Sequence, residues 1–360
     1  MFAILITLRK EFIYQKMRTG FSDYFENSPS KVITEETFTH PAMESFHIVK
    51  NVYIDYFYQT PVFYSTLDVI TMLVESCMFY NCSSGYSGGA VYFECSRSQC
   101  GVVSTCFSRC FVDGIYDGQA LYLYSGTTST NMIDFVSTYQ CSPDTLLLRR
   151  SSIYTRSGTQ KINSVNSSWN IVQLYSCLNI FQPASANISY STFFRNSVIE
   201  YTAIYLHTGA TPLMMYCNFI GNNSPSSTSY GCIHRHSGST IFAISFSVFQ
   251  ENLNILFSAS SFSISVTNSW IQHQGTRNSG SFSPAAPTTS AFTQTINLSH
   301  IRTFYCHPGQ VIQLEYTQCP TVPDPPTACQ ITEQGSTMVI QSLLSSLIMV
   351  TRLSLVSLSY

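Results

Sequence analysis

Short runs of alternating aliphatic and aromatic residues recur along the central part of the chain, each bounded by serine, glycine or asparagine. Examples are Ala90–Phe93, Leu121–Tyr124 and Ala203–Leu206. A period of two is typical of a β-strand with one buried face, and the interior lacks the 3.6-residue period of an amphipathic helix. β-Branched and aromatic residues favour pleated surfaces, whereas serine, asparagine and glycine favour turns. The pattern therefore predicts an all-β fold built from short strands.

The motif Phe-x-x-Asn gives these strands a period. It occurs strictly at Phe193–Asn196, Phe219–Asn222 and Phe249–Asn252. The starts of these copies are spaced by roughly 26 to 30 residues, and self-similarity at such a period indicates a solenoid. Looser copies of the motif are Met78–Asn81, Phe107–Cys110 and Phe135–Thr138.

A second motif follows the first in several copies. Gly88-Gly89-Ala90-Val91 recurs one period later as Gly118-Gln119-Ala120-Leu121, and looser versions begin at Tyr201 and Tyr230. A run of four to six residues cannot bury a face alone, but in a coil it pairs with its counterpart about 4.8 Å away in the next turn. The two motifs together predict a right-handed parallel β-helix with irregular terminal segments.

The motif residues are interpreted as scaffold. We expect the phenylalanines to point inward and stack on their equivalents, and the asparagines to sit at turns, in left-handed geometry, and bond to neighbouring turns. The two glycines would bend the backbone, and the alanines would fit a crowded interior. The residues concerned are Phe107, Phe193, Phe219 and Phe249, Asn196, Asn222 and Asn252, Gly88 and Gly89, and Ala90 and Ala120.

The 13 cysteines follow the repeat in part. Cys77 and Cys106 are aligned directly before the phenylalanine position, and Cys82 and Cys110 lie at nearly the same phase of successive copies. We expect mostly reduced, buried thiols, because stacked side chains run parallel at a spacing that a disulfide does not favour. Zinc is the alternative, but these spacings are not standard metal knuckles. Outside the repeat, one disulfide is expected among Cys306, Cys319 and Cys329.

Charge and motif content exclude several classes of function. Charged residues make up 10% of the chain and the formal net charge is -2, which lacks the basic footprint of a nucleic-acid-binding protein. No phosphate loop, dinucleotide fingerprint or hydrolase elbow occurs, so no cofactor is predicted. Asp113 and Asp117 form the best carboxylate pair for a polysaccharide-cleaving site, although a turn explains them more simply. His234 and His236 would share one face of a strand, with no third metal ligand evident.

The stretch Cys77–Phe93 resembles the repeat of the polymorphic outer-membrane proteins, which combines F-x-x-N with G-G-A-[ILV]. That repeat is known in chlamydial autotransporter adhesins and in a large surface-protein family of trichomonad parasites, and the richness in cysteine and tyrosine is more similar to the latter. Thr303–His307, followed by proline-rich sequence, also looks like the end of an ectodomain in that family. The resemblance covers roughly residues 70–306. It implies a right-handed β-helix, surface exposure and a role in adhesion.

Four segments are predicted along the chain. Residues 1–45 form a leader or cap, 46–306 the parallel β-helix, 307–337 a linker containing proline and cysteine, and 338–360 a hydrophobic tail that is a candidate membrane anchor. Gln274–Ser290, rich in serine, glycine, proline and threonine, is predicted to be a protruding loop.

The predicted function is that of a non-enzymatic cell-surface or secreted protein that binds an extracellular protein or glycan, with adhesion as its role. The alternative is a carbohydrate-active enzyme on the same scaffold, either a polysaccharide lyase or a glycosidase. In a secreted chain, Asn166, Asn187 and Asn297 are the best glycosylation candidates among the Asn-x-Ser/Thr sequons, because Asn81 and Asn222 occupy the motif asparagine position.

Overall fold

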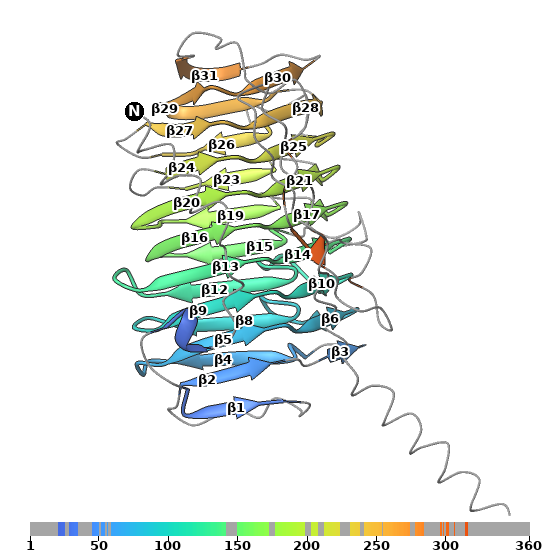
Figure 1. Cartoon of the computed structure of the whole chain (residues 1–360), viewed down its shortest axis with the longest axis vertical. Coiled ribbons are helices and arrows are strands. Elements are labelled where there is room, and N and C mark those ends of the chain that lie inside the picture. The colour runs from blue at the N-terminus through green and yellow to red at the C-terminus, as the bar shows by residue number, and fades with distance from the viewer. Residues whose placement is uncertain are drawn as a thin grey trace, which may run out of the picture.

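The computed structural model shows an all-β chain in which parallel strands stack as a β-helix, as the sequence predicts. Figure 1 shows the rungs following one another from β1 at one end to β31 at the other. The structure describes residues 21–25, 29–34, 45–49, 52–54, 56, 59–141, 150–172, 177–198, 203–207, 212–223, 231–237, 241–253, 255–273, 278–283, 296, 298, 300–301, 306 and 314–315.

Three ladders of parallel strands run along the coil. Ladder A consists of β4 (Val62–Thr66), β8 (Val91–Cys95), β12 (Leu121–Ser125), β15 (Ile153–Arg156), β19 (Leu178–Phe181), β23 (Ile204–Leu206) and β26 (Ile233–Arg235). Ladder B consists of β1 (Lys31–Ile33), β2 (Phe46–Val49), β5 (Thr71–Glu75), β9 (Gln99–Val103), β13 (Thr130–Asp134), β16 (Thr159–Asn163), β20 (Ser185–Ser189), β24 (Pro212–Met215) and β27 (Phe242–Ser245). The long strand β29 (Phe257–Thr267) continues both ladders and pairs with β31 (Asn278–Ser283).

Ladder C is a separate nine-stranded sheet. Its strands are β3 (Val52–Ile54), β6 (Met78–Tyr80), β10 (Cys106–Ser108), β14 (Ser137–Tyr139), β17 (Asn166–Ser168), β21 (Thr192–Phe194), β25 (Asn218–Ile220), β28 (Val248–Asn252) and β30 (Trp270–His273). Shorter elements are η1 (Phe21–Asp23), the parallel pairs β7 (Ser83–Ser84) with β11 (Phe111–Val112) and β18 (Ile171–Val172) with β22 (Ser197–Val198), and the antiparallel pair β32 (His300–Ile301) with β33 (Leu314–Glu315).

The inward position of ladder C carries the phenylalanine stack. Phe193, Phe219 and Phe249 lie in register, with ring centroids 4.9 Å apart at both steps. Phe107 stacks in the same way on Phe79, at 5.0 Å. The predicted motif copy at Met78 is therefore displaced by one residue, because Met78 points outward beside Phe79. The copy at Phe135 is displaced by three, since Thr138 pairs with Phe107.

A left-handed residue turns the chain at each end of the ladder C strands. Before the strands these residues include Ser76, Ser104 and Ser164, with φ between 48° and 53°. After the strands the corner residue immediately precedes the motif asparagine, as Arg195 does before Asn196. The prediction of left-handed geometry for the motif asparagine is therefore wrong for Asn196, Asn222 and Asn252. It holds for Asn81 of the looser copy at Met78, whose φ is 54°.

The buried side chains of the motif asparagines instead join the corner to the preceding turn through hydrogen bonds. Asn222 Nδ2 donates to the carbonyl of Phe193 at 2.8 Å, and its Oδ1 accepts from the backbone N–H of Asn196 at 3.1 Å. Asn252 makes the same pair of contacts with Asn222 and Phe219. Asn196 makes it with Asn170 and Ser167. Each asparagine thus satisfies one donor and one acceptor of the preceding turn, where no water could do so.

Cysteines take over this corner position towards the N-terminal end. Cys82, Cys110 and Cys141 occupy it, and each thiol points to the carbonyl that an asparagine amide would reach, as Cys110 Sγ does to Phe79 O at 3.5 Å. All three thiols are free and buried. Burial, reinforced by Cys141 and Cys82, raises the pKa of Cys110 well above its ordinary value, so this thiol stays protonated.

The motif glycines sit at a second crowded corner. Gly88 and Gly118 have φ of 73° and 71°, a region that residues with a Cβ rarely adopt. A Cβ on Gly89 would collide with backbone carbonyls of Phe111 and Gln119. Ala90 and Ala120 are fully buried next to each other in the following position.

The ends of the coil differ from the predicted segment limits. β1 pairs with β2, so residues within 1–45 already form a rung. The aromatic residues around η1 pack on the side of the coil, where Phe21 and Phe25 contact Leu73 and Val103. β31 lies within the predicted loop Gln274–Ser290 and continues the coil as a strand.

Within the described ranges, no helix has the length and apolar character to cross a membrane. The tail at 338–360, and all of 307–337 except 314–315, lie outside those ranges.

We predict that Asn222→Ala lowers the free energy of unfolding by about 1–3 kcal/mol, because it orphans a buried carbonyl and a buried N–H of the neighbouring turn. Chemical denaturation followed by circular dichroism measures the change. Asn187→Ala, at an exposed position of β20, is the matched control in protein freed of N-glycans and should change stability by less than about 0.5 kcal/mol. Equal losses in the two variants would contradict the role of the Asn222 hydrogen bonds in stabilising the corner.

Candidate binding surface

The outer surface of ladder A carries two parallel columns of side chains. Strand pairing places the first, the tyrosine column, in register through Phe63, Tyr92, Tyr122, Tyr154, Asn179, Tyr205 and His234. Two residues further along each strand is the second, the mixed column, which contains Glu94, Tyr124, Arg156 and Phe181 and continues with His207 and His236. Between the columns, the alternate residues of the same strands face the core.

Within the tyrosine column the rings lie face to face. Ring centroids are 4.7 Å apart for Phe63 and Tyr92, 4.8 Å for Tyr92 and Tyr122, and 4.9 Å for Tyr122 and Tyr154. Stacking of this kind covers the faces of the inner rings, so only their edges and hydroxyl groups can remain accessible. The exposed fraction falls along the column, from 43% at Phe63 to 6% at Tyr154.

Burial holds the phenols of this column in their neutral form. Desolvation, with a smaller effect of the nearby Glu94, raises the pKa of Tyr122 to about 12. Desolvation also raises the pKa values of Tyr92 and Tyr154 above their ordinary value. The hydroxyl of Tyr92 donates to the carboxylate of Glu94, so the column presents hydrogen-bonding hydroxyls rather than phenolate charge.

The mixed column places a cation between aromatic rings. The guanidinium carbon of Arg156 lies 4.7 Å from the ring centroid of Tyr124 and 5.3 Å from that of Phe181. Phe181 stacks on His207 at 4.3 Å, and His207 on His236 at 4.8 Å. Arg156 is therefore held by cation–π contacts on both sides, a geometry that favours arginine over lysine.

The histidines of this surface are poor bases. Burial, with repulsion from His236, lowers the pKa of His234 to about 3, and His234 Nδ1 is 2.8 Å from the hydroxyl of Ser258. Burial and then His236 also lower the pKa of His207. His234 and His207 are therefore uncharged at neutral pH. Among the described residues, no three His, Cys, Asp or Glu side chains form a group that could hold a metal ion.

The two carboxylates considered for an enzyme, Asp113 and Asp117, differ in exposure and in their partners. Asp113 is exposed, whereas Asp117 is largely buried and forms an ion pair with Arg150 at 3.5 Å and a hydrogen bond from Ser151. Burial raises the pKa of Asp117, while Arg150 opposes the rise. Gly114 and Gly118, which directly follow Asp113 and Asp117, both have positive φ, as expected for a turn.

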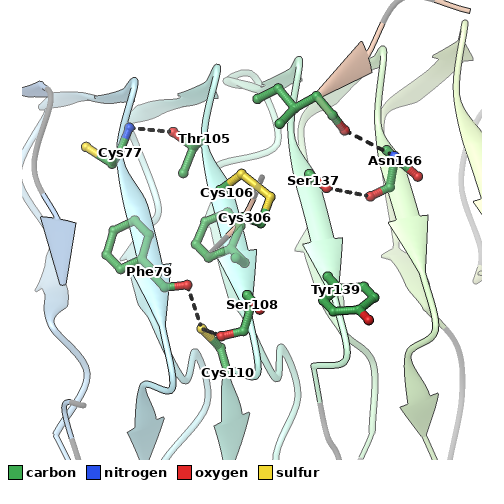
Figure 2. The surroundings of a disulfide bond; sticks show 12 residues. Cys77, Phe79, Thr105, Cys106, Ser108, Cys110, Ser137, Tyr139, Asn166 and Cys306 are labelled. Atoms are coloured by element: carbon green, nitrogen blue, oxygen red, sulfur yellow. Dashed lines mark hydrogen bonds between the residues drawn. A yellow bond between two sulfur atoms is a disulfide. The ribbon is translucent and has the colours of Figure 1, made fainter. Parts of the chain in front are cut away.

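A C-terminal strap crosses the outer face of ladder C. Its described residues are Ile296, Leu298, His300–Ile301 and Cys306. Ile296 exchanges two hydrogen bonds with the side chain of Asn218, at 2.6 and 3.0 Å. The carbonyl of Ile301 accepts from Asn166 Nδ2 at 3.1 Å, and Cys306 is disulfide-bonded to Cys106 on β10 (Figure 2). The strap therefore runs back along the coil from β25 to β10.

This disulfide bears on two predictions about the cysteines. Cys306 pairs with Cys106, so the disulfide predicted among Cys306, Cys319 and Cys329 would have to join Cys319 and Cys329, both of which lie outside the described residues. Cys106 points outward from ladder C, in register with Met78, so it does not belong to a thiol stack with Cys77. Cys77 instead aligns with Thr105, one residue earlier.

The structure separates the three predicted glycosylation sites. Asn187 is exposed on β20. Asn166 is 6% exposed and its amide donates to the strap, so the expectation that it is a surface acceptor is wrong for the folded chain. Asn297 lies outside the described residues.

Sequence reasoning missed both the outward columns and the strap. The tyrosine column was visible as Tyr92 and Tyr122, which follow Ala90 and Ala120 at the same place in successive copies of the Gly-Gly-Ala motif. No local pattern indicated the strap, because its contacts join positions as far as 200 residues apart.

Comparisons with protein-family models, curated proteins and solved structures find no match.

We predict that peptide mapping of unreduced protein recovers Cys106 and Cys306 as one cross-linked pair. Cys82, Cys110 and Cys141 should react with an alkylating reagent only after denaturation, because they are buried. A Cys306 cross-link to Cys319 or Cys329 would contradict the pairing.

We also predict that protein purified from a eukaryotic secretory host carries sugar on Asn187 and none on Asn166. A folded chain whose Asn166 amide is bonded inside cannot display a glycan there without losing the strap contact. Site-resolved mass spectrometry measures both positions, and full occupancy of Asn166 would show that the strap is placed wrongly.

Proposed function

We propose that this protein is a non-enzymatic β-helix protein of the cell surface or the secreted fraction, which binds an extracellular ligand and acts in adhesion. The observation that carries the proposal is the Cys106–Cys306 disulfide. Structural disulfides persist in oxidising, extracytoplasmic compartments and are rare in the cytosol. This bond joins segments that are far apart in sequence.

The distribution of side chains supports a binding role. The motif phenylalanines, asparagines and alanines are all buried in the coil, where they can make the scaffold but cannot touch a ligand. The tyrosine and mixed columns lie on the outer side of the ladder A strands, where Phe63 is 43% and Tyr154 6% exposed. They are rich in tyrosine and include an arginine, two residue types that are enriched at recognition surfaces. The resemblance to the surface-protein repeat points to the same role.

The ligand and the place of action follow from these properties. The partner is an extracellular protein or glycan, and the chain reaches it from a cell surface or in secreted form. The hydrophobic tail at 338–360 would supply membrane association in the first case.

One observation favours the alternative of a carbohydrate-active enzyme. Glu94 and Asp117 both act electrostatically on Tyr122, so two carboxylates flank the same part of ladder A. Cleaving enzymes need such pairs, but Asp117 is already engaged by Arg150. Polysaccharide cleavage that disappears in Glu94→Gln and Asp117→Asn would decide for the enzyme.

Labelling intact cells of the source organism with a membrane-impermeant amine reagent tests the proposal. The protein should be recovered in the labelled fraction or in the culture medium, while a cytosolic marker protein stays unlabelled. Recovery only after cell lysis would overturn the proposal.

A further inference from the structure

Arg156 and Glu94 are the two charges of the mixed column, and Tyr124 lies between them. Arg150, nearby in sequence, is neutralised by Asp117. No described carboxylate forms an ion pair with Arg156, whose guanidinium is held by the rings of Tyr124 and Phe181. A fixed, partly exposed arginine without a counter-ion is a natural partner for a carboxylate or sulfate group.

Hydrogen-bonding capacity near this arginine is also unmet. Nε of Arg156 and Oδ1 of Asn179, which lie on the adjacent strands β15 and β19, are buried without a hydrogen-bond partner. The rings that flank the guanidinium, Tyr124 and Phe181, are partly exposed, whereas Tyr154 is 6% and Tyr205 5% exposed. Because Nε of Arg156 is itself buried, an anionic group reaches the guanidinium from its partly exposed side.

The mixed column repeats along the axis of the coil. Arg156, Phe181, His207 and His236 stand on successive rungs about 4.8 Å apart, and strand pairing and ring stacking keep them in one line. A linear polymer can lie along several rungs of such a row, whereas a compact ligand would contact only one or two of them.

On these grounds, and resting on the proposed function, we propose that the mixed column from Arg156 to His236 binds an anionic polysaccharide. The chain lies along the β-helix axis with a carboxylate or sulfate against the Arg156 guanidinium. Nucleic acid is disfavoured as the anion by the low content of basic residues in the chain.

His207 makes this affinity depend on pH. The described titratable side chains that face it are Tyr205 and His236. Burial and then His236 lower the pKa of His207, so this histidine is uncharged in the free protein at neutral pH. A bound anion favours protonation, and the affinity therefore rises as pH falls.

Binding of the full-length secreted protein to immobilised heparin, hyaluronan and dextran tests the proposal. Arg156→Gln should weaken binding to heparin or hyaluronan by about tenfold or more, and dextran should not bind. The matched control is Arg195→Gln, because Arg195 also lies over aromatic rings, at 5.0 Å from Trp169 and 5.1 Å from Phe194, but beside ladder C. Preference for heparin or for hyaluronan identifies the anionic group, sulfate or carboxylate, and either result supports the site.

The pH dependence provides a second readout on heparin, whose sulfates do not titrate in this range. Affinity should rise severalfold from about pH 7.5 to about pH 5, and the variant His207→Gln should lose this rise while retaining binding at the higher pH. Circular dichroism confirms that each variant is folded.

Three results would overturn the inference: equal loss in Arg156→Gln and Arg195→Gln, equal binding of dextran, or tighter binding of polyglutamate than of either acidic polysaccharide. If the protein is labelled on intact cells but binds neither acidic polymer, the inference fails and the proposed function stands. Absence from both the cell surface and the medium would remove the proposed function itself.

Discussion

The fold depends on one recurring contact, in which a buried side chain at a corner reaches back to the main chain of the preceding turn. At the corner after ladder C this is the amide of Asn196, Asn222 or Asn252. At the corner before it, a hydroxyl such as that of Ser247 accepts from a backbone N–H, here that of Cys217. Parallel pairing alone would allow turns to slip along one another. A side chain that bonds only to a specific carbonyl or N–H of its neighbour fixes the register.

This constraint explains why loops of varying length do not disturb the coil. The step along the chain from Phe219 to Phe249 is longer than the step from Phe193 to Phe219, yet the rings stack at the same spacing in both. The extra residues enter between the ladders and leave the corners untouched. Where the asparagine is replaced by cysteine, as at Cys110, the thiol keeps the contact to the carbonyl but is a weaker partner. The buried phenylalanine stack maintains the alignment there.

The period and fold class could be predicted because corner and core positions repeat within a short window of sequence. Phe193 and Asn196 are close neighbours in the chain, and the physics that selects them is local. The inward-pointing residue was predicted wrongly in the copies at Met78 and Phe135. Several adjacent residues there are apolar or aromatic, and composition does not tell which one points inward. The left-handed geometry was predicted for the motif asparagine, but the chain places Arg195, Trp169 and Glu251 in it. Left-handed geometry is costly for such residues, and hydrogen bonds to the next turn offset that cost. The candidate site could not be predicted from the sequence, because the contacts of Arg156 depend on which strands become neighbours.

The strap changes how the molecule carries mechanical load. An open solenoid pulled from its ends would unwind turn by turn, since each turn is held mainly by its neighbours. Tension applied to the chain beyond Cys306 instead passes through the covalent bond into Cys106 on β10. The turns between these two residues, which include Arg156 and the two histidines of the mixed column, lie outside the load path. A pull on the chain would stretch the turns before β10 while leaving that surface in its resting shape.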